Sequence, residues 1–178
     1  MKFENVLKER RSIRRYKDTP VSEEDIKTCL KAALLAPSWK NSETLRFYVV
    51  TSDERLAEMK ESCLPPFNAK NCANAPVLIA AAFQKGNSGF NPDGTPSNEI
   101  GDGWGFYDLG LACENLCLQA TALGLGTLTM GIRNEAALRA LLQVPEDQII
   151  VSVISLGVPD IEPSKPARKK VKEIAKFL

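Results

Sequence analysis

Apolar residues recur along this chain at two spacings, one typical of helices and one typical of strands. Helical spacing is clearest between Ser22, whose hydroxyl can cap a helix in a capping-box-like pair with Asp25, and Pro37, which ends one. The apolar positions of this predicted helix are Ile26, Leu30, Ala33 and Leu34. A longer helical pattern, 104–123, is apolar on most sides and ends at Gly124. Such a helix is buried, either centrally or in a subunit interface.

Shorter patterns complete the predicted elements. Apolar and β-branched runs predict strands at 47–51, 77–83, 126–130 and 148–156. Helical spacing predicts helices at 3–10, at 56–63 until Pro65-Pro66 breaks the pattern, and at 134–142 with Asn134 as its cap. Because helices and strands are mixed along the chain, we expect one α+β domain over 1–178, with a sheet flanked by helices.

Two segments lack a regular apolar pattern. Residues 84–103 contain five glycines and two prolines, and a loop this long in a compact domain is usually functional or disordered. We interpret it as a flexible flap or an insertion over a pocket, with a passive surface loop as the alternative. The tail 160–178 is polar and basic, yet Val171, Ile174 and Leu178 recur at helical spacing. We expect this tail to dock on a partner subunit.

The composition argues against several classes of protein. The 178 residues are 44% hydrophobic and 25% charged with a net charge of +1, which argues against a nucleic-acid or membrane-surface protein as a whole. No apolar run approaches the roughly 20 residues that a membrane span needs, and Met1–Asn5 begins no signal peptide, so we expect a cytoplasmic protein. The five cysteines include Cys113 and Cys117, which we interpret as buried apolar residues.

The chain contains no histidine. Zinc sites built on histidine, His-based catalytic triads and histidine general acids or bases are therefore excluded. We expect no metal site and no catalytic side chain. A bound cofactor is expected to supply the chemistry.

Arginines are concentrated near the start of the chain. Four of them, Arg10, Arg11, Arg14 and Arg15, fall within six residues together with Ser12. Planar guanidinium donors suit phosphate groups and ring carbonyls, so the cluster is interpreted as a socket for a phosphorylated ligand. A solvated basic turn is the alternative.

Three further stretches are candidates for ligand contact. Residues 36–41 combine a Pro-Ser turn, a tryptophan and an asparagine, which suits the edge of a ring but also a simple helix stop. Residues 124–131 are rich in glycine, which allows close backbone approach to a ligand or tight helix–strand packing. This stretch follows a helix and has its third glycine too late for a Rossmann fingerprint. The tail adds Lys165 and Arg168, which alone are weak signals.

Taken in order, these stretches resemble the nitroreductase family of FMN-dependent oxidoreductases over nearly the whole chain. The matching motifs are Arg10–Tyr16, Ala36–Ser38 with Asn41, Gly124–Thr127, Leu156–Pro159 and Pro166–Arg168. Where the family usually has Gln-Pro-Trp, this chain has Glu43-Thr44-Leu45, and Pro166 replaces a frequent lysine. The resemblance implies a nitroreductase-like fold, with a central, mostly antiparallel sheet, in an intertwined homodimer with two FMN sites at its interface.

The resemblance also implies roles for individual residues. Arg10, Arg11 and Ser12 would hold the FMN phosphate and ribityl chain, and Arg14 would face the pyrimidine edge of the flavin. The partner subunit would contribute Pro37, Ser38, Trp39 and Asn41. The remaining residues would line the ring (Thr129, Met130 and Gly131, with backbone N–H groups toward N5 and O4) or close on the phosphate (Arg168 and, beside it, Lys165).

The activity implied by the resemblance is a ping-pong oxidoreduction. NADH or NADPH would give a hydride to flavin N5, and a flat electron-poor acceptor such as a nitroaromatic or a quinone would then be reduced. A flavin-storing or sensing module without turnover is one alternative. A nucleic-acid-binding domain that uses Arg10–Arg15 and the basic tail is another.

Overall fold

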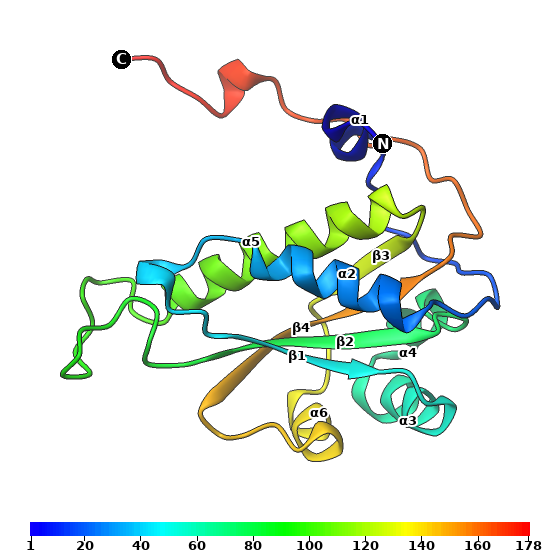
Figure 1. Cartoon of the computed structure of the whole chain (residues 1–178), viewed down its shortest axis with the longest axis horizontal. Helices are drawn as coiled ribbons and strands as arrows, with labels where there is room; N and C mark the ends of the chain where they lie inside the picture. The colour runs from blue at the N-terminus through cyan, green and yellow to red at the C-terminus, as the bar shows by residue number, and fades with distance from the viewer.

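The computed structural model describes residues 1–178 and forms three layers, with helices on both faces of one sheet (Figure 1). The four strands lie in the order β1-β2-β4-β3, and every neighbouring pair is antiparallel. They are β1 (Leu45–Val50), β2 (Val77–Gln84), β3 (Gly126–Met130) and β4 (Gln148–Gly157). The predicted α+β class and antiparallel central sheet are thus confirmed.

The helices divide between the two faces of the sheet (Figure 1). The long helices α2 (Glu23–Leu34) and α5 (Gly103–Ala122) cover one face. The other face carries α3 (Asp53–Glu58), α4 (Pro66–Asn71) and α6 (Glu135–Leu142). Beside α5 lies α1 (Phe3–Glu9), and three single-turn elements complete the chain: η1 (Trp39–Asn41), η2 (Met59–Cys63) and η3 (Val171–Glu173). None of the helices is both long and apolar enough to cross a membrane.

The sheet separates two apolar cores, and β2 contributes to both. Leu78, Ala80 and Ala82 belong to the cluster that includes residues of α3 and α6. The alternate positions, Ile79 and Phe83 among them, belong to the cluster with α2 and α5. Successive side chains of a strand point to opposite faces, so a strand buried on both faces becomes a continuous apolar run.

The helix ends agree with the capping signals in the sequence. The Ser22 hydroxyl accepts the Asp25 backbone N–H at 3.0 Å, and the Asn134 amide oxygen accepts the Ala137 N–H at 3.2 Å. Gly124 follows α5 with a φ of +78°, a left-handed conformation that favours glycine. These local signals fixed three helix boundaries.

Two predicted segments differ from the structure. The helix expected over 56–63 ends as α3 at Glu58 and continues as the π-helical turn η2. Pro66 begins α4, because proline is tolerated in the first turn of a helix, where its missing N–H is not needed. In the tail, the helical spacing yields only the short, exposed η3, and the tail runs past α1 away from the body (Figure 1).

Candidate cofactor site

The arginine cluster and the C-terminal segment enclose a hollow of about 390 Å³. No carboxylate and no large apolar side chain lines it, and we call it the arginine hollow. Its lining residues are Arg10, Arg11, Ser12, Arg14, Pro163, Ser164, Pro166 and Arg168. The fold thus brings together two basic segments from opposite ends of the chain. The resulting hollow is suited to an anion.

Two neighbouring elements hold the first of these segments in place. Ser12 forms an isolated parallel bridge with Thr127 of β3, and the Ile13 N–H donates to the Thr127 carbonyl at 2.9 Å. The Arg10 guanidinium lies 3.2 Å from the Glu114 carboxylate on α5. The start of the arginine cluster is therefore fixed between the sheet edge and the long helix.

Arg11 has an unused donor inside the structure. Its Nη1 donates to the carbonyls of Lys8 and Arg10, both at 2.7 Å, whereas its Nε is buried without any partner. Buried donors are almost always satisfied in proteins. An acceptor from a bound ligand would satisfy this one.

The remaining basic residues of the two segments differ in whether they line the arginine hollow. Arg15 turns away from the hollow, and its Nε donates to the Asp160 carboxylate at 2.9 Å. Lys165 does not line the hollow, although its neighbours Ser164 and Pro166 do. Arg168 lines it and forms no ion pair within the chain.

The free edge of β3 continues from the arginine cluster. The Thr127 carbonyl points away from β4 toward Ile13, so the peptide groups of Thr129, two residues on, point to the same open edge. Thr129 and Gly131 are exposed, and a Cβ added at Gly131 would meet nothing within 4 Å. The Met130 side chain is instead buried in the core. Backbone donors are thus accessible here.

Cys117 of α5 marks how closely these parts approach one another. Burial raises the pKa of its thiol, while a side-chain hydrogen bond with Thr127 opposes that rise. The Glu114 charge raises the pKa further, whereas the Arg10 charge and a hydrogen bond with Thr129 oppose the rise without cancelling it. Arg10 and Thr129, from separate predicted motifs, therefore both lie close to one buried thiol.

The second set of predicted residues, 37–41, lies elsewhere in the chain. The Trp39 backbone N–H donates to the Asp108 carboxylate at 2.9 Å, and its ring lies 4.7 Å from that of Trp104. Figure 1 shows this segment near the N-terminal end of α5, away from α1. The exposed Glu43 accepts the Asn41 side-chain amide at 3.1 Å. One chain alone does not bring 37–41 to the arginine hollow.

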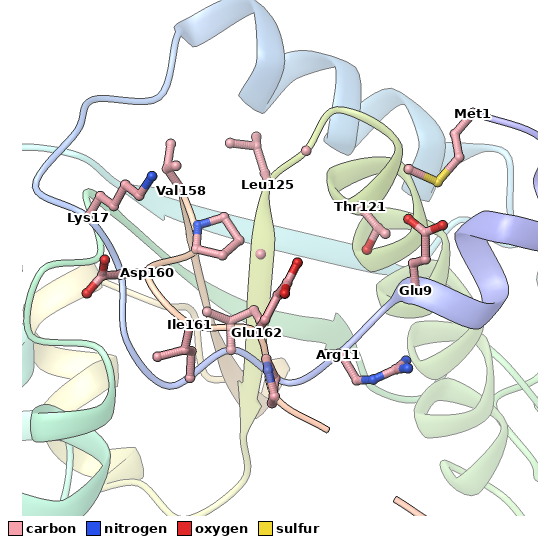
Figure 2. A pocket seen from close by; sticks show the side chains of 15 residues that line it. Met1, Glu9, Arg11, Lys17, Thr121, Leu125, Val158, Asp160, Ile161 and Glu162 are labelled. Atoms are coloured by element: carbon pink, nitrogen blue, oxygen red, sulfur yellow. The ribbon is translucent and has the colours of Figure 1, made fainter. Parts of the chain in front are cut away.

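A larger hollow of about 900 Å³ adjoins the arginine hollow and shares Arg11 and Pro163 with it. It lies between the end of α1, the turn from α5 to β3, and residues 158–163 (Figure 2). Figure 2 shows side chains of both charges around it, including Glu9 and Lys17. Mixed charge gives this hollow less preference for an anion than the arginine hollow has.

The sequence did not reveal several residues of the site. Glu114, which orients Arg10, and Asp108, which holds Trp39, both lie within the apolar pattern of α5. Pro163 and Ser164 belong to a polar tail with no motif of their own. Only the three-dimensional fold gives these residues partners, so no local signal could have found them.

Comparison with known proteins identifies the family. Residues 7–158 match the model of the nitroreductase family. A protein of Archaeoglobus fulgidus named "Putative NADH dehydrogenase/NAD(P)H nitroreductase" is 39% identical over 157 residues, which cover 86% of this chain and 83% of that protein. The "NADPH-flavin oxidoreductase" of Vibrio harveyi is 28% identical over 92% of this chain and 70% of its own length. This chain belongs to the nitroreductase family.

A solved structure agrees with this assignment. A protein from Desulfovibrio desulfuricans, described as a "putative nitroreductase in complex with fmn", superposes with a TM-score of 0.80. It is 26% identical, and the match covers 100% of this chain and 97% of that chain. The nitroreductase-like fold that the sequence motifs implied is therefore confirmed.

Proposed function

We propose that this chain is an FMN-dependent oxidoreductase that takes a hydride from NADH or NADPH and reduces a flat, electron-poor acceptor such as a nitroaromatic or a quinone. One observation carries the proposal: in a nitroreductase-family chain, the arginine hollow is lined by guanidiniums and by no carboxylate. Relatives named "NADPH-flavin oxidoreductase" and "FMN reductase [NAD(P)H]" support it.

The arginine hollow fits the phosphate of FMN. Of the guanidiniums that line it, those of Arg11, Arg14 and Arg168 form no ion pair within the chain. The buried Arg11 Nε also lacks an acceptor. A phosphate dianion would supply the missing counter-ion for these guanidiniums. Its oxygens would also accept a hydrogen bond from the unsatisfied Nε donor.

The proposed roles follow from these positions. Arg10, Arg11, Ser12 and Arg168 bind the phosphate, and Lys165, which does not line the hollow, is assigned no contact. The Arg14 charge stabilises negative charge at the pyrimidine edge of the ring. When bound, FMN supplies the hydride chemistry. The chain itself binds, orients the ring and excludes water, with backbone donors available at the open edge of β3.

We further propose that the protein works as a homodimer. Residues 37–41 lie near the N-terminal end of α5, away from α1. A second copy would therefore have to contribute them to the flavin ring. The tail adds apolar side chains without cover, since Ile174 is 72% exposed and Phe177 is 89% exposed. Exposed apolar residues on an extended arm favour docking on a partner.

Anaerobic stopped-flow mixing tests the proposed activity. The flavin-loaded protein should lose its visible flavin absorption on mixing with NADH or NADPH, and regain it when a nitroaromatic or a quinone is added. A flavin band that stays unchanged with both nicotinamides would contradict catalysis and would favour the sensing module instead.

A further inference from the structure

Three segments far apart in the sequence meet at one buried carboxylate, Asp108 of α5. Its Oδ2 accepts the Trp39 backbone N–H at 2.9 Å and the Ser88 hydroxyl at 2.7 Å. Ser88 is 1% exposed and also contacts the hydroxyls of Ser42, at 2.8 Å, and Thr44, at 3.3 Å. We call this group the Asp108 junction. It joins η1, the base of the 84–103 loop and the start of α5.

A carboxylate in this position is costly to bury. Asp108 is 4% exposed, and no lysine or arginine of the chain forms an ion pair with it. Burying a charge requires compensation by partners and hydrogen bonds. The compensation here is two donors that converge on a single oxygen, one from the first residue of η1 and one from the 84–103 loop.

The segment held by the Asp108 junction is strained. Lys40, Asn41 and Glu43 have φ values of 48°, 55° and 49°, in a left-handed region that residues other than glycine seldom occupy. One further hydrogen bond stabilises this turn: the Ser38 hydroxyl accepts the Glu43 N–H at 3.1 Å. Strained backbone persists only where its surroundings over-determine it.

The loop is fastened at the same place. Gly89 follows Ser88 with a φ of +85°, and a Cβ there would lie 2.6 Å from the Trp104 ring. The Trp104 ring in turn contacts that of Trp39, and its Nε1–H donates to the Asn98 amide oxygen at 3.0 Å. The base of the 84–103 loop and η1 are therefore connected by a hydrogen-bond route and by an aromatic route.

We propose that Asp108 is a positioning residue that holds Trp39–Asn41 in the conformation required for contact with the flavin of a second copy. Ser88 couples the 84–103 loop to the same carboxylate. Asp108 itself touches neither flavin nor substrate in this proposal. The inference rests on the proposed function, because it concerns the segment that completes the FMN site.

Substitutions at Asp108 in the full-length chain test the proposal. Asp108→Ala removes both hydrogen bonds, so it should raise the Kd for FMN at least about tenfold and alter the absorption spectrum of the flavin bound at saturation. Asp108→Asn keeps an oxygen that accepts both donors, so it should restore the spectrum and bring the Kd to within about threefold of the unmodified protein. A role in stability alone would leave the spectrum unmoved.

Asp102→Ala is the matched control. Asp102 lies at the same end of α5 and accepts the Gly86 N–H at 2.7 Å from the same loop, but it forms no hydrogen bond with η1. It should leave both the Kd and the spectrum unchanged. Ser88→Ala is the second test variant, since it keeps the Asp108–Trp39 bond and should raise the Kd by only about threefold. If Asp108→Ala does not fold, Ser88→Ala decides: a raised Kd supports the positioning role, and a Kd equal to that of the control overturns it.

The outcomes separate the two proposals. An unmodified protein that binds no FMN would overturn the proposed function. An unmodified protein that binds FMN, together with Asp108→Ala and Ser88→Ala variants that show the same Kd and spectrum as the control, would overturn the positioning role alone. So would an Asp108→Asn variant as impaired as Asp108→Ala.

Discussion

The arginines of this chain differ in whether a carboxylate already neutralises them. Arg10 lies 3.2 Å from Glu114 and Arg15 lies 2.9 Å from Asp160, whereas Arg11, Arg14 and Arg168 have no acidic partner. The motif in the sequence could not distinguish these groups, because the carboxylates come from distant parts of the chain. The unpaired arginines are the ones that line the arginine hollow without compensation, and we expect them to respond most to a bound anion.

Replacing Arg14 tests this difference. Arg14→Ala should weaken FMN binding by about tenfold or more and lower the midpoint potential of the bound flavin, because a positive charge that stabilises the reduced ring is lost. Fluorescence quenching gives the affinity and a redox titration gives the potential. Arg15→Ala is the control, since the Arg15 guanidinium is engaged by Asp160. An Arg14→Ala protein with an unchanged potential would refute the assignment.

Gly105 gives a residue-scale prediction about packing. A Cβ at this position would lie 2.2 Å from Cε2 of Phe83, in the core between α5 and β2. Gly105→Ala should therefore lower the free energy of unfolding by about 1–3 kcal/mol in urea denaturation. Gly110→Ala, on the same helix with nothing within 4 Å, should be neutral or stabilising by up to about 1 kcal/mol. Equal effects of the two substitutions would contradict this packing.

Three cysteine thiols predict how the free energy of unfolding depends on pH. Burial raises the pKa of Cys29 and Cys72 to about 11 and that of Cys113 to about 12, from an ordinary 9.0. Unfolding exposes these thiols, so the unfolded chain loses their protons at lower pH than the folded chain does. Their stabilising contribution is complete below about pH 8 and is lost as the pH rises through about 9 to 12.

Urea denaturation at a series of alkaline pH values measures this effect. The free energy of unfolding should fall with pH by at most about 1.4 kcal/mol per pH unit for each thiol. Replacing Cys72 with alanine should make the fall shallower, because one of the contributing groups is gone. The same slope with and without Cys72 would show that other groups cause the loss.

At the scale of elements, the sequence predicted those segments that carry their own signal. The apolar run predicted β2, and Ser22 with Pro37 predicted α2, because capping and burial act on neighbouring residues. It missed α4, because Pro66 was taken only as a break although proline also suits a first helical turn. The Asp108 junction left no local pattern, since its members contact one another only after the chain has folded.

The C-terminal tail supplies a prediction at this scale. Deleting residues 164–178 removes Arg168 together with the exposed apolar side chains of the arm. The truncated protein should stay folded, because residues 164–178 are exposed, but it should become monomeric and lose FMN. Light scattering and FMN titration check both properties. Arg168→Ala in the full-length chain should lose FMN affinity and remain dimeric. A truncated protein that is dimeric and yellow would contradict the role of the tail.

For the whole molecule, the two groups of proposed site residues lie apart in one chain. The arginine hollow and the open edge of β3 lie together, whereas Trp39 and its neighbours lie near the N-terminal end of α5. Two copies related by a two-fold axis would exchange these groups, which would make two equal sites. The expectation is therefore one FMN per chain and two per dimer.

Comparison of FMN with riboflavin tests the central claim most directly, because the two differ only by the phosphate that the arginine hollow is proposed to bind. In a titration of flavin-free protein followed by flavin fluorescence, we expect one FMN per chain and a Kd for riboflavin at least about a hundredfold higher. Equal affinities for the two flavins, or binding of neither by a well-folded protein, would contradict the account.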